Sequence, residues 1–381
     1  MKRRRRRHLL KTMGFAIAII IIQLIFALGH FLFYKTLVRF FNIKNKRIKL
    51  ALKIALIFLG VSFVLASILP FAWFYLIAAS WLGFLHFFFW ASVLCWAVYG
   101  IFKLAKLKFK KLRFSKLHFK ITAGILFGLA LLISVYGIFN AMNFQIREIE
   151  VKLPNLSKTW ENKTIAFISD VHVGKIDGAD FADKIVNKIM TLNPDLIFIG
   201  GDYYDGHIDD IAELTKPLEN LKAFRGVYFV TGNHEKFDND KKYENAIDLA
   251  GIVVMNNMMT DLDGLQIIGV DYAVTTNKNK FKEVLDGMKI NKSKPSILIK
   301  HSPINLDVAN DAGISLQLSG HTHVGQIYPY NWLTHLIYKG YDYGLNLFGN
   351  MQVYTSNGVG TWGPPMKVGN TPEIVLIKML K

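Results

Sequence analysis

Hydrophobic positions are distributed very differently in the two halves of the chain. Residues 12–34, 54–102 and 121–146 contain no charged residue. A helix needs about 20 apolar residues to cross the hydrocarbon core of a bilayer, so each of these runs is long enough to span it. The middle run has room for two crossings, with a break at "LPFAW" (69–73). We therefore predict four membrane-spanning helices, near residues 13–34, 52–70, 77–101 and 121–141.

Basic residues fill the connections between these predicted helices. Residues 35–53 carry seven Lys and Arg, and residues 103–120 carry eight. The alternation over 103–120 fits neither a helix nor a strand cleanly, and suits either a segment lying on anionic headgroups or a solvated loop. These loop charges favour an external second half, whereas the strongly basic first eleven residues favour a cytoplasmic one. We expect a multi-pass protein of the cell (inner) membrane, and the side that holds the second half stays open.

The charge of the chain changes abruptly near residue 148. Residues 1–147 hold 23 of the 46 Lys and Arg residues and no Asp or Glu, so all 28 acids lie in residues 148–381. The net charge of +18 therefore belongs to the membrane half, and we expect no nucleic-acid partner. We predict a membrane region over 1–147 and a folded domain over 148–381. The single cysteine, Cys95, excludes a disulfide framework and a cysteine-based metal site.

From about residue 160, short apolar runs alternate with helix-like stretches. Four runs end in polar, Gly-containing or His-containing residues: "KTIAFISD" (163–170), "DLIFIGGD" (195–202), "GVYFVTGNHE" (226–235) and "PSILIKHS" (295–302). Helix-like stretches follow the first three, at roughly 179–192, 208–222 and 239–250. This alternation predicts βαβ units and an α/β fold whose sheet is covered on both faces. Further strand-like runs predict a second sheet, at 265–270, 315–319, 352–356 and 373–378.

Five polar clusters stand at the predicted strand ends. In chain order they are "SDVH" (Asp170, His172), "GGD" (Asp202), "GNHE" (Asn233, His234, Glu235), "KHSP" (His301) and "SGHTH" (His321, His323). Sites in α/β sheets lie beyond the carboxyl ends of the strands, so we expect these side chains to converge. Each cluster taken alone is an ordinary polar turn or a buried histidine. The five together, in one order, favour a functional site.

The residue types of these clusters indicate a two-metal site. Carboxylate, carboxamide and imidazole groups suit Mn²⁺, Fe or Zn²⁺. In an extended stretch, residues i and i+2 point to the same side, so Asp170 with His172, and His321 with His323, can each present two donors together. The neighbouring glycines allow a close backbone approach. Two ions about 3.5–4 Å apart can hold the attacking and leaving oxygens of a phosphoryl group.

The order DxH, GD, GNHE, H, GHTH resembles the calcineurin-like metallophosphoesterase family over about residues 160–381. The tail "YTSNGVGTWGPPMKVGNTPEIVLIKM" (354–379) resembles its membrane-associated bacterial branch. The resemblance implies a four-layer αββα sandwich with a dinuclear centre of two divalent metal ions (Mn²⁺, Fe²⁺/³⁺ or Zn²⁺), here preceded by an all-α membrane region. It also implies that the ions activate a water for attack on phosphorus.

The same resemblance assigns a role to each candidate residue. It implies that Asp170, His172 and His323 bind the first ion and that Asp202 bridges both. It implies that Asn233, His301 and His321 hold the second ion. His234 is the implied catalytic residue, which contacts the phosphate and stabilises the transition state or protonates the leaving group. Glu235 stands where the family often has Asp, a change that keeps the carboxylate.

The substrate is less defined than the reaction. Members of this family cleave phosphomonoesters, diesters and pyrophosphates. Anchoring raises the effective concentration toward lipids, so we expect the bilayer as a partner and a lipid-linked phosphate substrate, for example of the UDP-diacylglucosamine type. The aromatic stretch over 327–348 forms an apolar wall for acyl chains in one interpretation, and packs the second sheet or the membrane-proximal surface in the other.

Two alternative functions differ from this one. A tethered phosphodiesterase would act on soluble nucleotides or other diesters. A membrane receptor or transporter with a regulatory phosphoesterase-like domain would need charged residues within its spans. The predicted spans contain Gln23, His30 and His86 and, apart from Lys53 at the start of the second span, no Asp, Glu, Lys or Arg, which disfavours a transporter.

Overall fold

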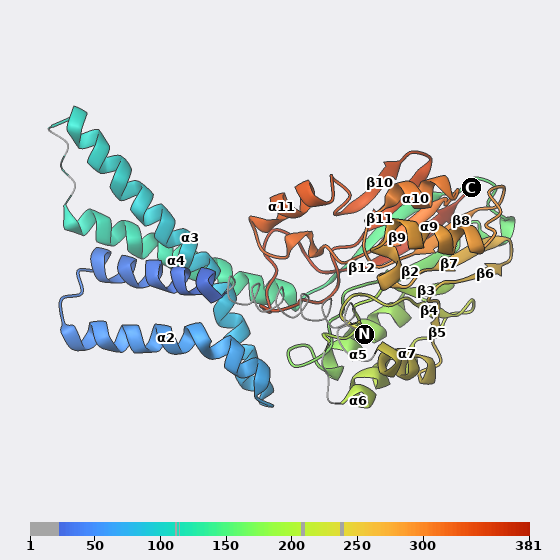
Figure 1. Ribbon diagram of the computed structural model, residues 1–381, viewed down its shortest axis with the longest axis horizontal. Helices are drawn as coiled ribbons and strands as arrows, with labels where there is room; N and C mark the ends of the chain where they lie inside the picture. The colour runs from blue at the N-terminus through green and yellow to red at the C-terminus, as the bar shows by residue number, and fades with distance from the viewer. Residues whose placement is uncertain (1–22, 111–112, 114, 207–209, 237–239) are drawn as a thin grey trace, which may run out of the picture. The chain divides into compact units, whose positions relative to one another are not determined.

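The computed structural model describes residues 23–110, 113, 115–206, 210–236 and 240–381, and the chain forms two compact units, residues 1–136 and 137–381 (Figure 1). The described part of the first unit is helical. Its elements are a helix over residues 23–40, α2 (Lys46–Ile68), α3 (Ala72–Lys108) and α4 (Lys116–Ala141), whose last turn belongs to the second unit.

Three of these helices, α2, α3 and α4, are long and apolar enough to cross a membrane. The predicted span at 13–34 begins outside the described residues, and from Gln23 onward it is helical. The predicted break at 69–73 falls where α2 ends and α3 begins, because Pro70 has no N–H to continue a helix.

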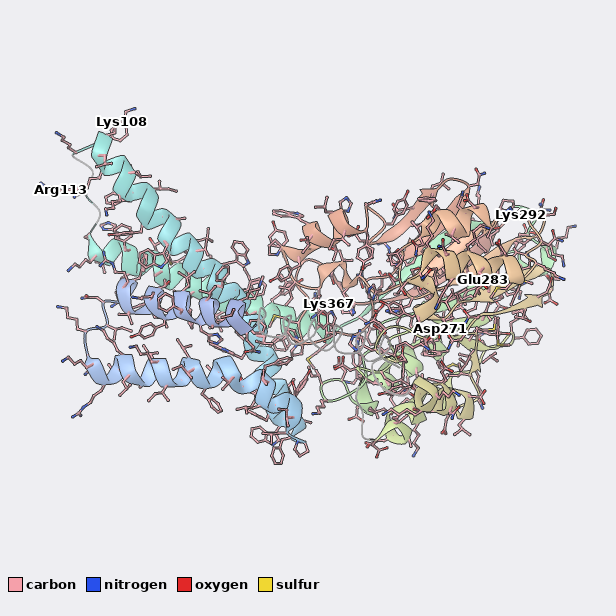
Figure 2. All side chains as sticks on the ribbon, in the orientation of Figure 1. Lys108, Arg113, Asp271, Glu283, Lys292 and Lys367 are labelled. Carbon is pink, nitrogen blue, oxygen red and sulfur yellow. The ribbon has the colours of Figure 1, made fainter. Side chains whose placement is uncertain are left out.

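The connection between α3 and α4 is shorter than we predicted. Residues 103–108 continue α3, and α4 already begins at Lys116, so the expected interfacial segment over 103–120 is largely helical. Lys106 and Lys108 occupy the last turn of α3, where positive charge complements the partial negative charge of a helix C-terminus. Lys108 and Arg113 mark this connection (Figure 2).

Polar side chains within the helical unit are bonded to one another. Trp81 Nε1 donates to His30 Nε2 at 2.9 Å, so the proton of His30 lies on Nδ1, which donates to the carbonyl of Phe26 at 2.8 Å. Trp96 Nε1 donates to Thr36 Oγ1 at 3.0 Å. Such bonds hold helices together in an apolar medium and give His30 a structural role.

The second unit contains two six-stranded sheets, with strand orders β1-β12-β2-β3-β4-β5 and β10-β11-β9-β8-β7-β6. The strands of the first are β1 (Gln145–Lys152), β12 (Glu373–Leu380), β2 (Thr164–Ile168), β3 (Leu196–Ile199), β4 (Val227–Phe229) and β5 (Val253–Val254). Those of the second are β10 (Gly344–Phe348), β11 (Met351–Thr355), β9 (Leu316–Ser319), β8 (Ser296–Ile299), β7 (Leu265–Gly269) and β6 (Met258–Leu262). β2, β3 and β4 run parallel, as do β7, β8, β9 and β11.

Buried side chains from both sheets form the central core. Phe167 and Phe198 of the first sheet pack in one cluster with Ile297 and Leu318 of the second. These strands are near-continuous apolar runs because both faces of each sheet are covered.

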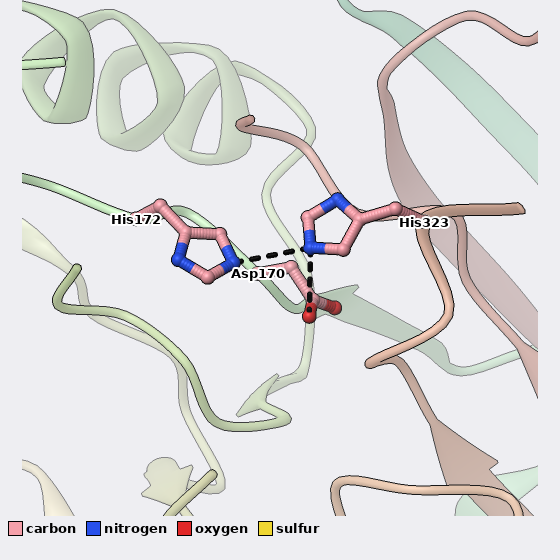
Figure 3. Close-up of side chains that lie close together, drawn as sticks. All are labelled: Asp170, His172 and His323. Carbon is pink, nitrogen blue, oxygen red and sulfur yellow. Dashed lines mark hydrogen bonds and ion pairs between the residues drawn. The ribbon is translucent and has the colours of Figure 1, made fainter. Parts of the chain in front are cut away.

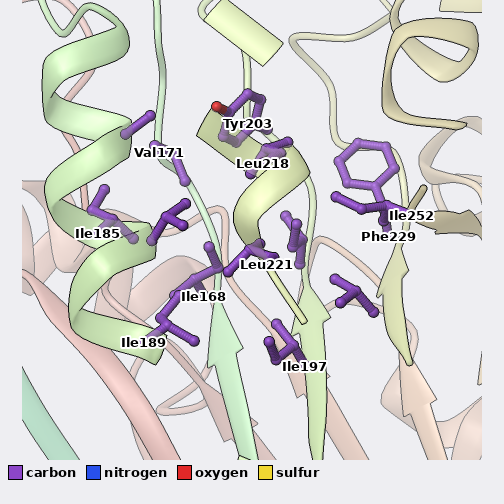
Figure 4. Close-up of a cluster of buried hydrophobic side chains, with 14 of the residues drawn as sticks. Ile168, Val171, Ile185, Ile189, Ile197, Tyr203, Leu218, Leu221, Phe229 and Ile252 are labelled. Carbon is purple, nitrogen blue, oxygen red and sulfur yellow. The ribbon is translucent and has the colours of Figure 1, made fainter. Parts of the chain in front are cut away.

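Helices cover the two outer faces. On the first sheet lies α5 (Ala179–Thr191), whose Ile185 and Ile189 pack against Ile168 and Ile197 (Figure 4). Further helices along this side are α6 (Ile211–Thr215) and α7 (Asp240–Leu249) (Figure 1). On the second sheet lie α9 (Lys278–Gly287) and α10 (Leu306–Asp311). The remaining helices are the short α8 (Tyr272–Thr275) and α11 (Tyr330–Ile337). The four layers confirm the predicted αββα sandwich.

Two expectations about elements were wrong. The run at 373–378 belongs to β12, which lies in the first sheet between β1 and β2, not in the second. The helix expected over 208–222 is only α6 followed by a 3-10 turn over Lys216–Asn220, which contains Pro217. Residues 207–209 lie outside the described residues.

Candidate metal centre

The predicted ligands sit on sharp turns directly after the strands. Asp170 and His172 follow β2, Asp202 follows β3, and His321 and His323 follow β9. All five have positive φ, between 46° and 75°, a conformation that is uncommon and costly for residues with a side chain. Such strain gathers at functional sites, where the surrounding structure holds it in place. The side chains therefore converge through left-handed turns, not through the extended alternation that we expected.

One buried group joins Asp170, His172 and His323 (Figure 3). His172 Nε2 lies 3.1 Å from His323 Nε2, which lies 3.4 Å from Asp170 Oδ1. Atoms that share one ion at about 2.1 Å in tetrahedral coordination lie about 3.4 Å apart, so these spacings fit a shared cation.

A second group joins Asp202, His301 and His321. His301 Nε2 lies 3.0 Å from Asp202 Oδ2 and 3.2 Å from His321 Nδ1. His321 and His323 thus belong to different groups although only Thr322 separates them.

The two groups adjoin through their carboxylates. Asp202 Oδ2 also lies 3.9 Å from His172 Nε2, and Asp170 Oδ1 lies 3.8 Å from His301 Nε2. Asp202 therefore stands between the groups, where a bridging ligand would be needed.

Asn233 and His234 border this cluster. His234 N–H donates to Asp202 Oδ1 at 2.8 Å, and its ring meets that of His172 edge to face, with centroids 4.5 Å apart. Among the residues that the structure describes, the buried atoms Asn233 Oδ1 and His323 Nδ1 have no hydrogen-bond partner. A buried oxygen without a donor is costly, and a cation would satisfy it. The contacts that place Asp202, His301 and His321 together do not include the Asn233 amide, and metal binding by these residues stays a prediction.

Two glycines make the convergence sterically possible. A Cβ on Gly320 would lie 2.1 Å from Asp170 Oδ2, and one on Gly232 would lie 2.1 Å from Asp202 Oδ1. No side chain fits at either position, because the neighbouring backbone must pass directly over the carboxylates.

The histidines of the cluster fall into two kinds, those with a raised pKa and those with a lowered pKa. Burial favours the neutral form of His301, but Asp202 and Asp170 outweigh it and raise its pKa to about 9. In the same way Asp205 and Asp202 raise the pKa of His172 against its burial. Burial, followed by the charge of His301, lowers the pKa of His321 to about 4. Burial, followed by the charge of His172, lowers the pKa of His323 well below its usual value. The proton on His301 thus supplies positive charge among the carboxylates, and divalent ions would replace it.

Asp205 is a residue that the sequence analysis missed. Its Oδ1 lies 3.3 Å from His172 Nδ1 and 3.5 Å from His234 Nδ1. A carboxylate behind a ligating imidazole fixes the ring and its tautomer. The signal in the sequence is the second acid of "GGDYYD", three residues after Asp202.

Glu235 holds the turns together. Its carboxylate is fully buried and accepts hydrogen bonds from the backbone N–H groups of Asp202 (3.0 Å), Tyr204 (3.1 Å) and Gly232 (2.7 Å). Burial, and then the charge of Asp202, raise its pKa to about 7. Glu235 therefore fastens the turn after β3 to the turn after β4.

Known proteins are similar to this chain in amino-acid sequence. The family model described as calcineurin-like phosphoesterase matches residues 163–325. An uncharacterized metallophosphoesterase of Campylobacter jejuni is 30% identical over 268 residues, which cover 67% of this chain and 70% of that protein. The chain belongs to the calcineurin-like metallophosphoesterase family. The family comprises metal-dependent phosphoester hydrolases, and the second unit is the metallophosphoesterase domain.

Two further relatives match this chain over part of their length. An uncharacterized metallophosphoesterase of Helicobacter pylori is 32% identical over 240 residues, 62% of this chain and 64% of that protein, so the chain spans less than two thirds of its length. A Bos taurus protein named transmembrane protein with metallophosphoesterase domain is 30% identical over 264 residues, 64% of this chain and 59% of that protein. With α2, α3 and α4, these likenesses identify this metallophosphoesterase as a membrane protein.

Proposed function

We propose that this metallophosphoesterase hydrolyses phosphoric ester or pyrophosphate bonds with two divalent ions. Asp170, His172 and His323 would hold one ion, and Asn233, His301 and His321 the other, with Asp202 between them. The observation that carries the proposal is the adjacency of two ligand groups at Asp202, in which every ligand but the partly buried His321 is buried. Oxygen and nitrogen donors without sulfur favour Mn²⁺, Fe²⁺/³⁺ or Zn²⁺.

The residues around the ions have separable tasks. Bound there, two divalent cations supply Lewis acidity toward water and toward the phosphoryl oxygens. Burial lowers the pKa of His234, which favours a neutral ring before substrate arrives. An anionic phosphate beside it would raise that pKa, so that the ring takes up a proton from water and passes it to the leaving oxygen. Asp205 orients His234 from behind.

We further propose that the substrate is a lipid-linked phosphate and that the protein is a multi-pass protein of the cell (inner) membrane. The three apolar helices support this, because anchoring concentrates the site at the bilayer. A nucleotide diphospho-lipid such as UDP-diacylglucosamine has the required pyrophosphate and acyl chains.

The test uses full-length protein purified in detergent. A bacterial lipid extract, UDP-diacylglucosamine and an aryl phosphodiester are offered in parallel with Mn²⁺, with and without a chelator. Asp202→Asn removes the central carboxylate. Asp195→Asn is the matched control, because Asp195 accepts a backbone hydrogen bond from Thr164, away from the cluster.

The outcomes separate the parts of the proposal. We expect chelator-sensitive cleavage of a lipid species that Asp202→Asn loses and Asp195→Asn keeps. Cleavage of the aryl diester alone would keep the reaction and reject the lipid substrate in favour of a tethered phosphodiesterase. No Asp202-dependent cleavage of any phosphate compound would reject hydrolysis.

A further inference from the structure

Helix α11 carries its apolar side chains on the outside of the second unit. Four large apolar residues are 53–76% exposed: Trp332, Leu333, Leu336 and Ile337. The partly buried positions, spaced as one helix face, are instead Asn331, Thr334 and Tyr338. A helix on a soluble domain turns its apolar stripe toward the core. The orientation of α11 is the reverse, which is expected where the surroundings are apolar.

The polar side chains of α11 are bonded locally. His335, whose side chain is 70% exposed, places Nδ1 2.9 Å from Oδ1 of the buried Asp342. Thr334 Oγ1 donates to the carbonyl of Asn331 in the same helix at 2.9 Å. Figure 1 shows α11 apart from α9 and α10, the helices that cover the second sheet. Packing of α11 on the second sheet therefore does not account for its exposed apolar face.

The base of α11 is bonded to the last turn of α4. Tyr328 N–H donates to the carbonyl of Val368 at 2.8 Å, and Lys367 N–H donates to the carbonyl of Gly137 at 2.9 Å. Asn140 Nδ2 donates to the carbonyls of Lys367 and Asn370 at 2.9 and 2.7 Å. All of these residues lie in the second unit. They form two consecutive backbone rungs between a candidate transmembrane helix and the segment that opens α11.

These rungs connect α11 to the end of α4. The uncharged part of α4 starts after Lys120, and about 20 residues cross the hydrocarbon, so α4 reaches the interface near residues 137–141. Two rungs of about 4.8 Å add roughly 10 Å between Gly137 and Tyr328. The eight residues of α11 extend only about 12 Å further.

The composition of this segment suits anionic headgroups. Residues 312–341 contain no Asp or Glu, and Lys339 follows α11 directly. Tyr328, Tyr330 and Trp332 are 42–66% exposed. Trp and Tyr concentrate at membrane interfaces because their rings are apolar and carry one polar group.

We propose that α11 lies in the interfacial layer of the bilayer that α4 crosses, with Trp332, Leu333, Leu336 and Ile337 among the lipids. Tyr338 ends this helix, and its ring centroid is 6.3 Å from that of His321. The docked helix therefore holds the candidate metal centre beside the headgroups. This membrane contact exists whether or not the site hydrolyses a lipid.

The test is a depth measurement on full-length protein in vesicles of phosphatidylethanolamine and phosphatidylglycerol. Cys95→Ala removes the only cysteine, and Leu336→Cys then carries an environment-sensitive NBD label. Leu249→Cys is the matched control: it is an exposed leucine at the end of α7, 87% exposed against 76% for Leu336. Lipids with a doxyl quencher high on the acyl chain report contact with the interface.

We expect blue-shifted emission and doxyl quenching at position 336, with neither at position 249. Water-like, unquenched emission at position 336 would overturn the proposal. Blue-shifted but unquenched emission there would also overturn it, because protein, from a second copy or from another part of the chain, would then cover α11. Equal quenching at both positions would show that the label partitions by itself, and would reject α11 as a specific contact.

Discussion

Replacing Asp205 by Asn tests whether the two histidines behind the candidate metal centre are positioned by one carboxylate. Asp205 Oδ1 lies 3.3 Å from His172 Nδ1 and 3.5 Å from His234 Nδ1, while His172 Nε2 faces the first ligand group. Asn has nearly the same shape but carries no charge, and its amide oxygen is a weaker acceptor.

The expected loss follows from the position of Asp205 behind a ligand. Carboxylates that orient a ligating imidazole contribute about 10- to 100-fold to metal affinity, which corresponds to about 1.4 to 2.7 kcal/mol. Asp205 also raises the pKa of His172, so a proton competes with the ion for the His172 imidazole. The titration is therefore run on the alkaline side of neutrality, where that competition is weaker.

The assay is Mn²⁺ binding by calorimetry to detergent-purified protein, with hydrolysis measured alongside. We expect the affinity of one ion to fall in Asp205→Asn and the other to stay within a few-fold, because Asp205 does not contact His301 or His321 in the second group. Asp195→Asn should bind both ions normally. Unchanged affinity for both ions would refute the positioning role, and equal loss of both would point to general damage.

Three further predictions concern other residues of the site. His234→Gln should lower kcat by about 10²- to 10⁴-fold while metal content by mass spectrometry stays at two ions, and loss of an ion would make His234 a ligand. Because the pKa of His301 is about 9, the ion must displace its proton below that pH. The affinity of the second ion should therefore rise about tenfold per pH unit from neutral pH and level off near pH 9. Calorimetry in two buffers measures the accompanying proton release. An affinity that does not change with pH would contradict this prediction. Gly358→Ala should lower Tm and weaken the first ion, because φ is +78° and the new Cβ would lie 2.7 Å from Asp170 Cβ, a cost of at least about 1–2 kcal/mol. Gly287→Ala, with no atom near its Cβ position, should leave both unchanged.

The sequence predicts the parts of this site that depend on local pattern. Buried parallel strands are continuous apolar runs, so β2, β3 and β8 stand out, and polar residues such as Asp202 mark their ends. The grouping of ligands follows from the same topology, since parallel strands bring their carboxyl ends to one edge.

What the sequence does not predict depends on distant contacts or on backbone conformation. β12 is an apolar run like any other, and only its pairing with β1 and β2 decides its sheet. The positive φ of Asp170 and His321 breaks the extended geometry, and residue type alone does not predict it. Asp205 resembles any surface acid until the turn after β3 brings it behind His172. The outward apolar face of α11 has the periodicity of an ordinary packed helix, so its orientation needs the structure.

The place of β12 has a consequence for how the protein is made. β1 follows the last transmembrane helix directly, and its partner in the sheet is β12, with Gln145 beside Glu373. During synthesis at about 5–20 residues per second, β1 waits roughly 10 to 50 seconds for that partner. Throughout that interval an unpaired strand edge stays next to the membrane while the helices before it are already inserted. Completion of the catalytic domain is therefore a late event in biogenesis. Chaperones that bind exposed strands would be needed at the bilayer surface.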